Sequence, residues 1–367
     1  MLRAETEWEE VPGQELPLRS LSPKSRGRAI ATLLAGSWRP EPPPYQRASI
    51  NEAGLASQIL ETGAGGLAWW RVRDSGLDFP GASELQEAYR LQTLQSGIHE
   101  GRIQEGVALL RAAYIEPLLA KGWLAAGLYA QRGLRPYGDI DLWVRPDQGP
   151  AAFEALGYPP GQQYPIDLHA NEPARDRTWD ELMDRSHSEP VGHTHVQALG
   201  AEDHLYLLSV HMLAHGAWRP LWLCDVAAAL ESLPKDFDWD YCLRGGKHRP
   251  NWLTTAIGLC SDVLGASPEE LPISIANARL PRWLVPAVLR SWGVGTPYMH
   301  TSPVGLTAPR PTALWNALRI RWPNPIQVTV DWNRGFDRTP RLPVQLAECF
   351  VRSGRFLLGR QAAIPRE

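Results

Sequence analysis

The chain has 367 residues, of which 44% are hydrophobic and 21% are charged, a composition typical of folded rather than disordered proteins. Its formal net charge of -3 argues against a protein that binds the phosphate backbone of long nucleic acids, because that function needs a concentrated basic surface. No apolar run approaches the roughly 20 residues that span a bilayer, and the acidic N-terminal residues are unlike a signal peptide. We therefore expect no membrane segment.

The cysteines are too far apart to suggest a shared site. There are four, Cys224, Cys242, Cys260 and Cys349, and no two of them have CxxC spacing. Neither a zinc knuckle nor a disulfide framework is indicated. A reducing, cytoplasmic location is the expectation that fits this usage.

The first part of the chain is predicted to be helical. Residues 1–27 show no sustained periodicity and are expected to form a flexible arm. A short helix beginning at Ala29 leads into a proline-rich break at 39–44. Apolar residues at helical spacing then predict further helices, so we assign residues 28–113 to an N-terminal helical region.

The pattern changes over residues 114–200, where short strands are predicted. The apolar run at 115–120 fits a buried strand that ends at Lys121-Gly122, and residues 125–131 are expected to form a helix. Strands are also predicted at 139–144 and 164–169. Alternating polarity over 191–199 indicates a single edge strand.

Acidic residues on two of these strands predict a metal site. Side chains at i and i+2 of a strand point to the same face, so Asp139 lies beside Asp141 and Asp167 lies beside His169. Adjacent carboxylates repel each other unless a cation lies between them, and Mg²⁺ uses such pairs when it also holds nucleotide phosphates. The structural alternative for Asp139 and Asp141 is a pair that closes a turn.

Residues 201–367 are predicted to form a C-terminal helical domain. His211 and His215 are one helical turn apart, a spacing that permits joint metal ligation, but their apolar neighbours favour packing or contact with a nucleotide. Asp225 is expected either to brace this domain or to contact substrate. Arg352 and Arg355 form either a phosphate patch or a solvated helix face.

As a set, these motifs resemble the nucleotidyltransferase superfamily typified by DNA polymerase beta. They are most similar to a widespread bacterial family of nucleotidyltransferase-like proteins, over roughly residues 28 to 350. The residues that carry the resemblance, in chain order, are Lys121-Gly122, Tyr129, Gly133, Arg135, Asp139-Ile140-Asp141-Leu142-Trp143-Val144, Ala152, Leu156, Gly157-Tyr158, Asp167-Leu168-His169, His211, His215 and Asp225-Val226-Ala227.

The resemblance implies an α+β fold, with a small mixed-sheet nucleotidyltransferase domain between helical regions. It also implies metal-dependent transfer of a nucleoside monophosphate from an NTP, expected to be ATP, to a hydroxyl, amine or phosphate of a small molecule or peptide. A tailoring step on a natural product or peptide would fit this chemistry.

The resemblance assigns roles to individual residues. Mg²⁺ or Mn²⁺ would be held by Asp139, Asp141 and Asp167. The nucleotide would be contacted by Lys121, Gly122, Arg135 and His169, although Arg135 could equally form a structural salt bridge and His169 a hydrogen bond within the strands. The substrate pocket is expected to include His211, His215 and Asp225.

One position departs from the wider superfamily, whose first motif is Gly-Ser or Gly-Gly. Trp123 follows Gly122 here, so no serine hydroxyl is available beside the phosphates. Phosphate binding would then rest on Lys121 and on backbone N–H groups. The departure favours one alternative, a non-catalytic nucleotide-binding or protein-binding member. Another phosphotransfer, or modification of transfer RNA, is disfavoured by the net negative charge.

Overall fold

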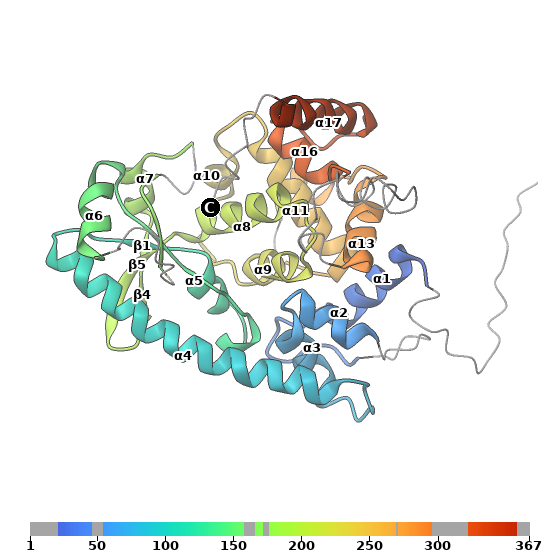
Figure 1. Ribbon diagram of the computed structural model, residues 1–367, viewed down its shortest axis with the longest axis horizontal. Helices are drawn as coiled ribbons and strands as arrows, with labels where there is room; N and C mark the ends of the chain where they lie inside the picture. Colours follow the sequence, from blue (N-terminus) through green and yellow to red (C-terminus); the bar gives the residue numbers. More distant parts are fainter. Residues whose placement is uncertain are drawn as a thin grey trace, which may run out of the picture.

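The computed structural model describes residues 21–45, 54–157, 166–171, 176–268, 271–295 and 322–357. For residues 355–357 it describes the backbone only. A mixed five-stranded sheet with short helices lies beside a larger group of helices (Figure 1). This arrangement confirms the predicted α+β class with helical flanks. Residues 1–20 of the predicted arm are outside the described residues, and residues 23–27 belong to the first helix.

Four helices precede the sheet: α1 (Pro23–Leu34), α2 (Leu55–Glu61), α3 (Gly65–Val72) and α4 (Ala82–Ala112). The first begins at Pro23 rather than at Ala29, because Ser22 caps it by accepting a hydrogen bond from the Ser25 N–H. It packs closely on α13 (Leu284–Val294). A Cβ at Gly27 or Gly293 would collide with the backbone of the other helix, so this contact depends on glycine at both positions.

Helix α4 is 31 residues long and runs along one side of the molecule, linking the helical part to the sheet (Figure 1). Near its start, Leu85 is buried in the helical core. Towards its end, Ile103, Val107 and Leu110 are buried in the core beneath the sheet. The same helix therefore contributes to both hydrophobic cores.

The sheet has the order β3-β2-β1-β5-β4. Its strands, listed in chain order, are β1 (Leu118–Leu119), β2 (Ile140–Trp143), β3 (Ile166–His169), β4 (His187–Val191) and β5 (Thr194–Ala198). The pairs β2/β3 and β1/β5 are parallel, whereas β1/β2 and β4/β5 are antiparallel. The predicted strand at 164–169 is described from Ile166 onwards.

The single edge strand predicted over 191–199 was wrong. The chain turns at Gly192, whose φ of 55° lies in the left-handed region, and the residues on either side form the hairpin β4-β5. Strand β5 pairs with β1 inside the sheet, and β4 is the edge. Alternating polarity on both sides of the turn concealed it.

Short helices connect the strands. Helix α5 covers Gly122–Ala126, so the helix predicted at 125–131 begins and ends earlier than expected. The shift follows from Lys121, which has a φ of 47° and whose carbonyl accepts a hydrogen bond from the Ala125 N–H at 2.6 Å. The others are η3 (Arg132–Leu134), η4 (Pro146–Gln148), α6 (Gly149–Ala155) and α7 (Trp179–Asp184).

The helices after the sheet are α8 (Ala201–Ala214), α9 (Pro220–Glu231), α10 (Trp239–Leu243), α11 (Arg249–Leu264), α12 (Ile273–Ala276), α13, α16 (Pro325–Asp331) and α17 (Leu342–Leu357). Helices α8, α9, α11 and α13 share one hydrophobic core with α1, α2 and α3. The division into domains at 113/114 and 200/201 stays a prediction. No helix in the described ranges combines the length and apolar character needed to cross a membrane. All four cysteines lie in those ranges and are free thiols.

A buried polar network attaches the sheet domain to α8 and α11. Asp203 accepts a hydrogen bond from the Tyr241 hydroxyl at 2.8 Å and pairs with Arg249 at 3.2 Å and Arg177 at 3.5 Å. Arg249 also pairs with Asp176 at 2.7 Å. Because each buried charge has an opposite partner, the network holds residues 176–177 against the helices without leaving an isolated ion.

Candidate functional site

Two neighbouring parallel strands bring the acidic residues together. In the β2/β3 register, Asp141 lies opposite Asp167 and Trp143 lies opposite His169. These four side chains share one face of the sheet because successive residues of a strand alternate between faces. The sequence predicted that Asp167 and His169 share a face, and the register adds Asp141 and Trp143 to them.

The cluster contains two carboxylates and an imidazole within ligand distance of one another. His169 Nε2 lies 3.2 Å from Asp141 Oδ1 and 3.4 Å from Asp167 Oδ2. One donor atom from each of Asp141, Asp167 and His169 lies within 4.8 Å of the others, the one such group found in the described part of the chain. Lys121 Nζ is 3.3 Å from Asp141 Oδ1. This donor set fits a divalent ion.

Asp139 is placed differently from Asp141. It precedes β2 and is exposed, and it is not part of the group formed by Asp141, Asp167 and His169. Desolvation of its carboxyl by nearby protein atoms, together with the negative charges of Asp141 and Asp167, raises the pKa of Asp139. It therefore belongs to the same electrostatic site, and a cation there would relieve the repulsion.

Asp141 is 4% exposed, and its charge is compensated from two sides. Burial by itself would raise the pKa of Asp141, but the hydrogen bond with His169 and the positive charge of Lys121 outweigh that effect and lower it. Asp141 is therefore held as a carboxylate at neutral pH. The side chain of Asp167 is 32% exposed, which makes it the open side of the cluster.

The indole ring of Trp143 packs against two residues of the site, His169 and Lys121. The His169 ring stacks on its indole with centroids 4.2 Å apart and an interplanar angle of 18°, and Lys121 Nζ lies 5.3 Å from the indole centroid. Sequence reasoning treated Trp143 only as an apolar position of the motif. Its spacing of two residues from Asp141 is the signal that places it on the same face.

The segment at Lys121-Gly122 approaches the loop before β2 closely. A Cβ on Gly122 would lie 3.0 Å from the Tyr137 ring and 3.1 Å from the Asp139 carbonyl oxygen, so glycine allows the two segments to meet. Lys121 itself has a positive φ of 47°. This backbone conformation is unfavourable for any residue except glycine, and such strained residues often lie at functional sites. Its ammonium group is thereby directed to the acidic cluster.

Arg135 and Asp225 form a buried ion pair. Arg135 donates to both Asp225 oxygens, with Nη2 2.8 Å from Oδ2 and Nε 3.1 Å from Oδ1, and the Tyr129 hydroxyl donates to Oδ1 at 2.7 Å. Asp225 is 1% exposed. Burial would lower the pKa of Arg135, but pairing with Asp225 raises it. These contacts correspond to the structural role that was expected as one alternative for each residue: a salt bridge for Arg135 and a brace of the helical domain for Asp225.

His211 and His215 pack around an aromatic side chain. Their rings lie 4.9 and 5.0 Å from the Trp222 ring, centroid to centroid, and 4.6 Å from each other. Within the described residues, neither belongs to a group of three potential metal ligands. Their surroundings therefore match the predicted packing role. Contact with a nucleotide stays a prediction for both.

Arg219 is a further cation near the site that sequence reasoning did not select. It precedes α9 and donates from Nε to the Thr62 carbonyl at 2.7 Å, and no carboxylate of the described residues pairs with it. Burial and the charge of Arg135 lower the pKa of Arg219, whereas the charges of Asp225 and Asp139 raise it. It is thus within electrostatic reach of Asp139. The sequence showed it only as part of Trp218-Arg219-Pro220.

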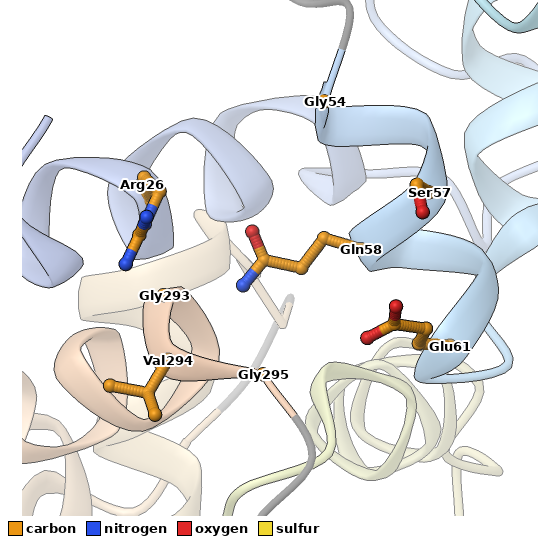
Figure 2. Close-up of a pocket in the computed structure, with 8 residues that line it drawn as sticks. All are labelled: Arg26, Gly54, Ser57, Gln58, Glu61, Gly293, Val294 and Gly295. Carbon is orange, nitrogen blue, oxygen red and sulfur yellow. The ribbon is translucent and has the colours of Figure 1, made fainter. Parts of the chain in front are cut away.

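Two cavities lie away from the acidic cluster. One of about 220 Å³ opens between α1, α2 and α13, where Gln58 reaches from α2 towards the other helices (Figure 2). Its lining residues are Arg26, Gly54, Ser57, Gln58, Glu61, Gly293, Val294 and Gly295. A second, of about 310 Å³, lies beside α1 and the end of α11. Neither is lined by a residue of the acidic cluster.

Comparison with known proteins gives one family. A family model described as an uncharacterised nucleotidyltransferase matches residues 49–167 and 164–254, which together exceed half of the 367-residue chain. No curated protein and no solved structure matches the chain.

Proposed function

We propose that this chain, which belongs to the family of uncharacterised nucleotidyltransferases, transfers a nucleoside monophosphate from an NTP to a small molecule or peptide with the help of a divalent metal ion. Family membership supports nucleotidyl transfer in general. The observation that carries the metal-dependent reaction is the parallel register that places Asp141 beside Asp167, with Asp139 in electrostatic reach.

The residues of the cluster have separate tasks in this proposal. Asp141 and Asp167, assisted by Asp139, would hold Mg²⁺ or Mn²⁺, which when bound offsets the charge of the nucleotide phosphates. Lys121, already directed to Asp141, would bind a phosphate oxygen together with the backbone at Gly122. ATP is the expected donor.

The chemistry is a substitution at the α-phosphorus. An oxygen or nitrogen of the acceptor forms the new bond to that phosphorus, the bond to the bridging oxygen breaks, and pyrophosphate leaves. The proton of the acceptor passes to a carboxylate. Asp167 is suited to this role because it is the exposed side of the cluster.

The acceptor is proposed to be a hydroxyl, amine or phosphate of a small molecule or peptide, as in a tailoring step. The net charge of -3 supports this choice over long nucleic acid. The half-buried faces of His211, His215 and Trp222, together with Arg219, are the proposed wall for the acceptor or the base.

Pyrophosphate release tests the function. The protein is incubated with Mg²⁺ or Mn²⁺, each NTP in turn and a cell extract as acceptor source. We expect release with the wild type, and a loss of at least roughly 100-fold in Asp139→Asn and Asp141→Asn. Asp147→Asn is the matched control, because Asp147 is an exposed carboxylate a few residues beyond β2. Equal rates in wild type and Asp141→Asn contradict the proposal.

A non-catalytic nucleotide-binding role is the second candidate, favoured by Trp123 following Gly122. Calorimetry separates the two functions. A binding module takes up an NTP with a measurable heat and leaves it intact, whereas the proposed enzyme consumes it when the acceptor is present.

A further inference from the structure

We propose that His169 is a direct ligand of the metal ion, together with Asp141 and Asp167, and that the site consequently prefers Mn²⁺ to Mg²⁺. The inference rests on the proposed function, because it specifies the ion and ligands of that same site. It differs from the expected set of three aspartates by replacing Asp139 with an imidazole. The positions of the donor atoms carry it.

The separations match those of neighbouring ligands on one ion. Two ligand atoms at right angles, each about 2.1 Å from an octahedral ion, are about 3.0 Å apart. His169 Nε2 is 3.2 Å from Asp141 Oδ1 and 3.4 Å from Asp167 Oδ2. Small movements of the side chains would therefore place one ion among all three atoms.

Hydrogen bonding alone accounts for this geometry less well. Nε2 carries at most one hydrogen, which can point at only one of the two carboxylates. Both distances are at or beyond the long end of the usual N–H···O range of about 2.7–3.2 Å. The hydrogen bond to Asp141 at 3.2 Å therefore leaves the 3.4 Å approach to Asp167 unexplained, whereas an ion bound among the three atoms accounts for both contacts.

The imidazole is also held in place. Its stack on Trp143, at 4.2 Å and 18°, restricts rotation of the ring, and Trp143 is itself only 3% exposed. The β2/β3 register sets this pairing, because Trp143 lies directly opposite His169. A fixed ring orientation aims Nε2 at the carboxylates, so we assign Trp143 as a positioning residue for the ligand.

A nitrogen ligand changes the choice of metal. Mg²⁺ takes oxygen ligands and gives up its water reluctantly, whereas imidazole suits transition ions and Mn²⁺ also accepts carboxylates. Lys121, 3.3 Å from Asp141 Oδ1, already offsets part of the negative charge. The site therefore offers two carboxylates and one imidazole, a set on which Mn²⁺ has the advantage.

Electron paramagnetic resonance tests the ligand directly. Free Mn²⁺ is titrated with the full chain, and the bound ion is examined by electron spin echo modulation, which detects a coordinated ¹⁴N nucleus. We expect one imidazole nitrogen in the wild type, none in His169→Gln, and a roughly 10- to 100-fold loss of Mn²⁺ affinity in that variant. His193→Gln, a change at an exposed turn histidine, should behave as wild type.

Competition with Mg²⁺ tests the preference. We expect wild type to bind Mn²⁺ at least about 10-fold more tightly than Mg²⁺. His169→Asp should keep binding a metal, lose the nitrogen coupling and shift towards Mg²⁺, which shows that the fold survives the substitution. Trp143→Phe should weaken the nitrogen coupling while both carboxylates still bind.

The outcomes separate this inference from the proposed function. Bound Mn²⁺ without nitrogen coupling in the wild type, or an unchanged Mn²⁺ to Mg²⁺ ratio in His169→Asp, overturns the inference, even if pyrophosphate is released. Nitrogen-coupled Mn²⁺ with no NTP turnover under any condition supports the ligand assignment and counts against the enzyme.

Discussion

Arg135 and Asp225 are joined by two hydrogen bonds that link the bend before β2 to helix α9, with Nη2 2.8 Å from Oδ2 and Nε 3.1 Å from Oδ1. Because Arg135 is only four residues before Asp139, this pair fixes the position of the acidic strand relative to the helical part. Tyr129 completes the arrangement by donating to the same carboxylate.

Removing one partner of this pair should be costly. Asp225→Ala leaves the Arg135 charge buried without a counter-ion, so we expect the free energy of unfolding to fall by about 3–5 kcal/mol. Urea denaturation measures it. The double variant Arg135→Met with Asp225→Leu should recover much of the loss, since no charge is then buried alone. Asp236→Ala, at an exposed position, is the control. A loss below about 1 kcal/mol in Asp225→Ala would rule out a bracing role.

Lys121 should contribute to turnover more than to stability. Lys121→Met removes the ammonium group 3.3 Å from Asp141 and, with it, the proposed phosphate contact. We expect kcat/KM for the NTP to fall roughly 100-fold. The pKa of Asp141 should also rise, because the charge of Lys121 helps to lower it. Steady-state kinetics compared with Lys235→Met, an exposed lysine, provide the measurement. Unchanged kcat/KM would remove Lys121 from the site.

Arg219 is predicted to bind an anionic group of a substrate. A charge-assisted hydrogen bond contributes about 1.5–3 kcal/mol, so Arg219→Ala should weaken binding of the affected substrate roughly 10- to 100-fold. Calorimetry with the NTP and the KM for the acceptor show which substrate is held. Arg219→Lys should retain part of the affinity. Arg282→Ala, at an exposed arginine, is the matched control. If both affinities are unchanged, Arg219 serves only to bind the Thr62 carbonyl.

His204 should make the protein less stable in mild acid. Burial, with added repulsion from Arg135 and His187, lowers the pKa of His204 to about 3, and its Nε2 is buried with no hydrogen-bond partner among the described residues. The unfolded chain therefore binds a proton that the folded chain does not. Stability is retained above the unfolded pKa of about 6.5 and falls as the pH drops towards the folded pKa.

Denaturation at pH 8 and pH 5 measures this contribution. From pH 8 to pH 5, the free energy of unfolding should fall by about 2 kcal/mol more in the wild type than in His204→Leu. The reason is that the unfolded wild type takes up a proton on His204, which the leucine variant does not. His193→Leu, at an exposed turn, should leave the pH dependence unchanged. A parallel pH dependence in wild type and His204→Leu would contradict the assigned pKa shift.

Local patterns predicted much of the sheet region. Alternation along a strand placed Asp141 on one face and paired Asp167 with His169, since the geometry of a strand depends only on neighbouring residues. The same reasoning did not predict the hairpin at Gly192, because the alternation of polar and apolar residues continues on both sides of the turn. Nor did it predict the start of α1, because that start is set by the single Ser22 cap and not by a periodic pattern of apolar residues.

The amino-acid sequence by itself determined the class of the fold, the acidic strand residues and the resemblance that the family match confirms. Only the tertiary structure decided that β2 and β3 are parallel neighbours, that the His169 ring stacks on Trp143, and that Arg135 pairs with Asp225. Propensity and periodicity act over a few residues. Pairing between residues as far apart in the chain as Arg135 and Asp225 depends on which surfaces the completed core brings together.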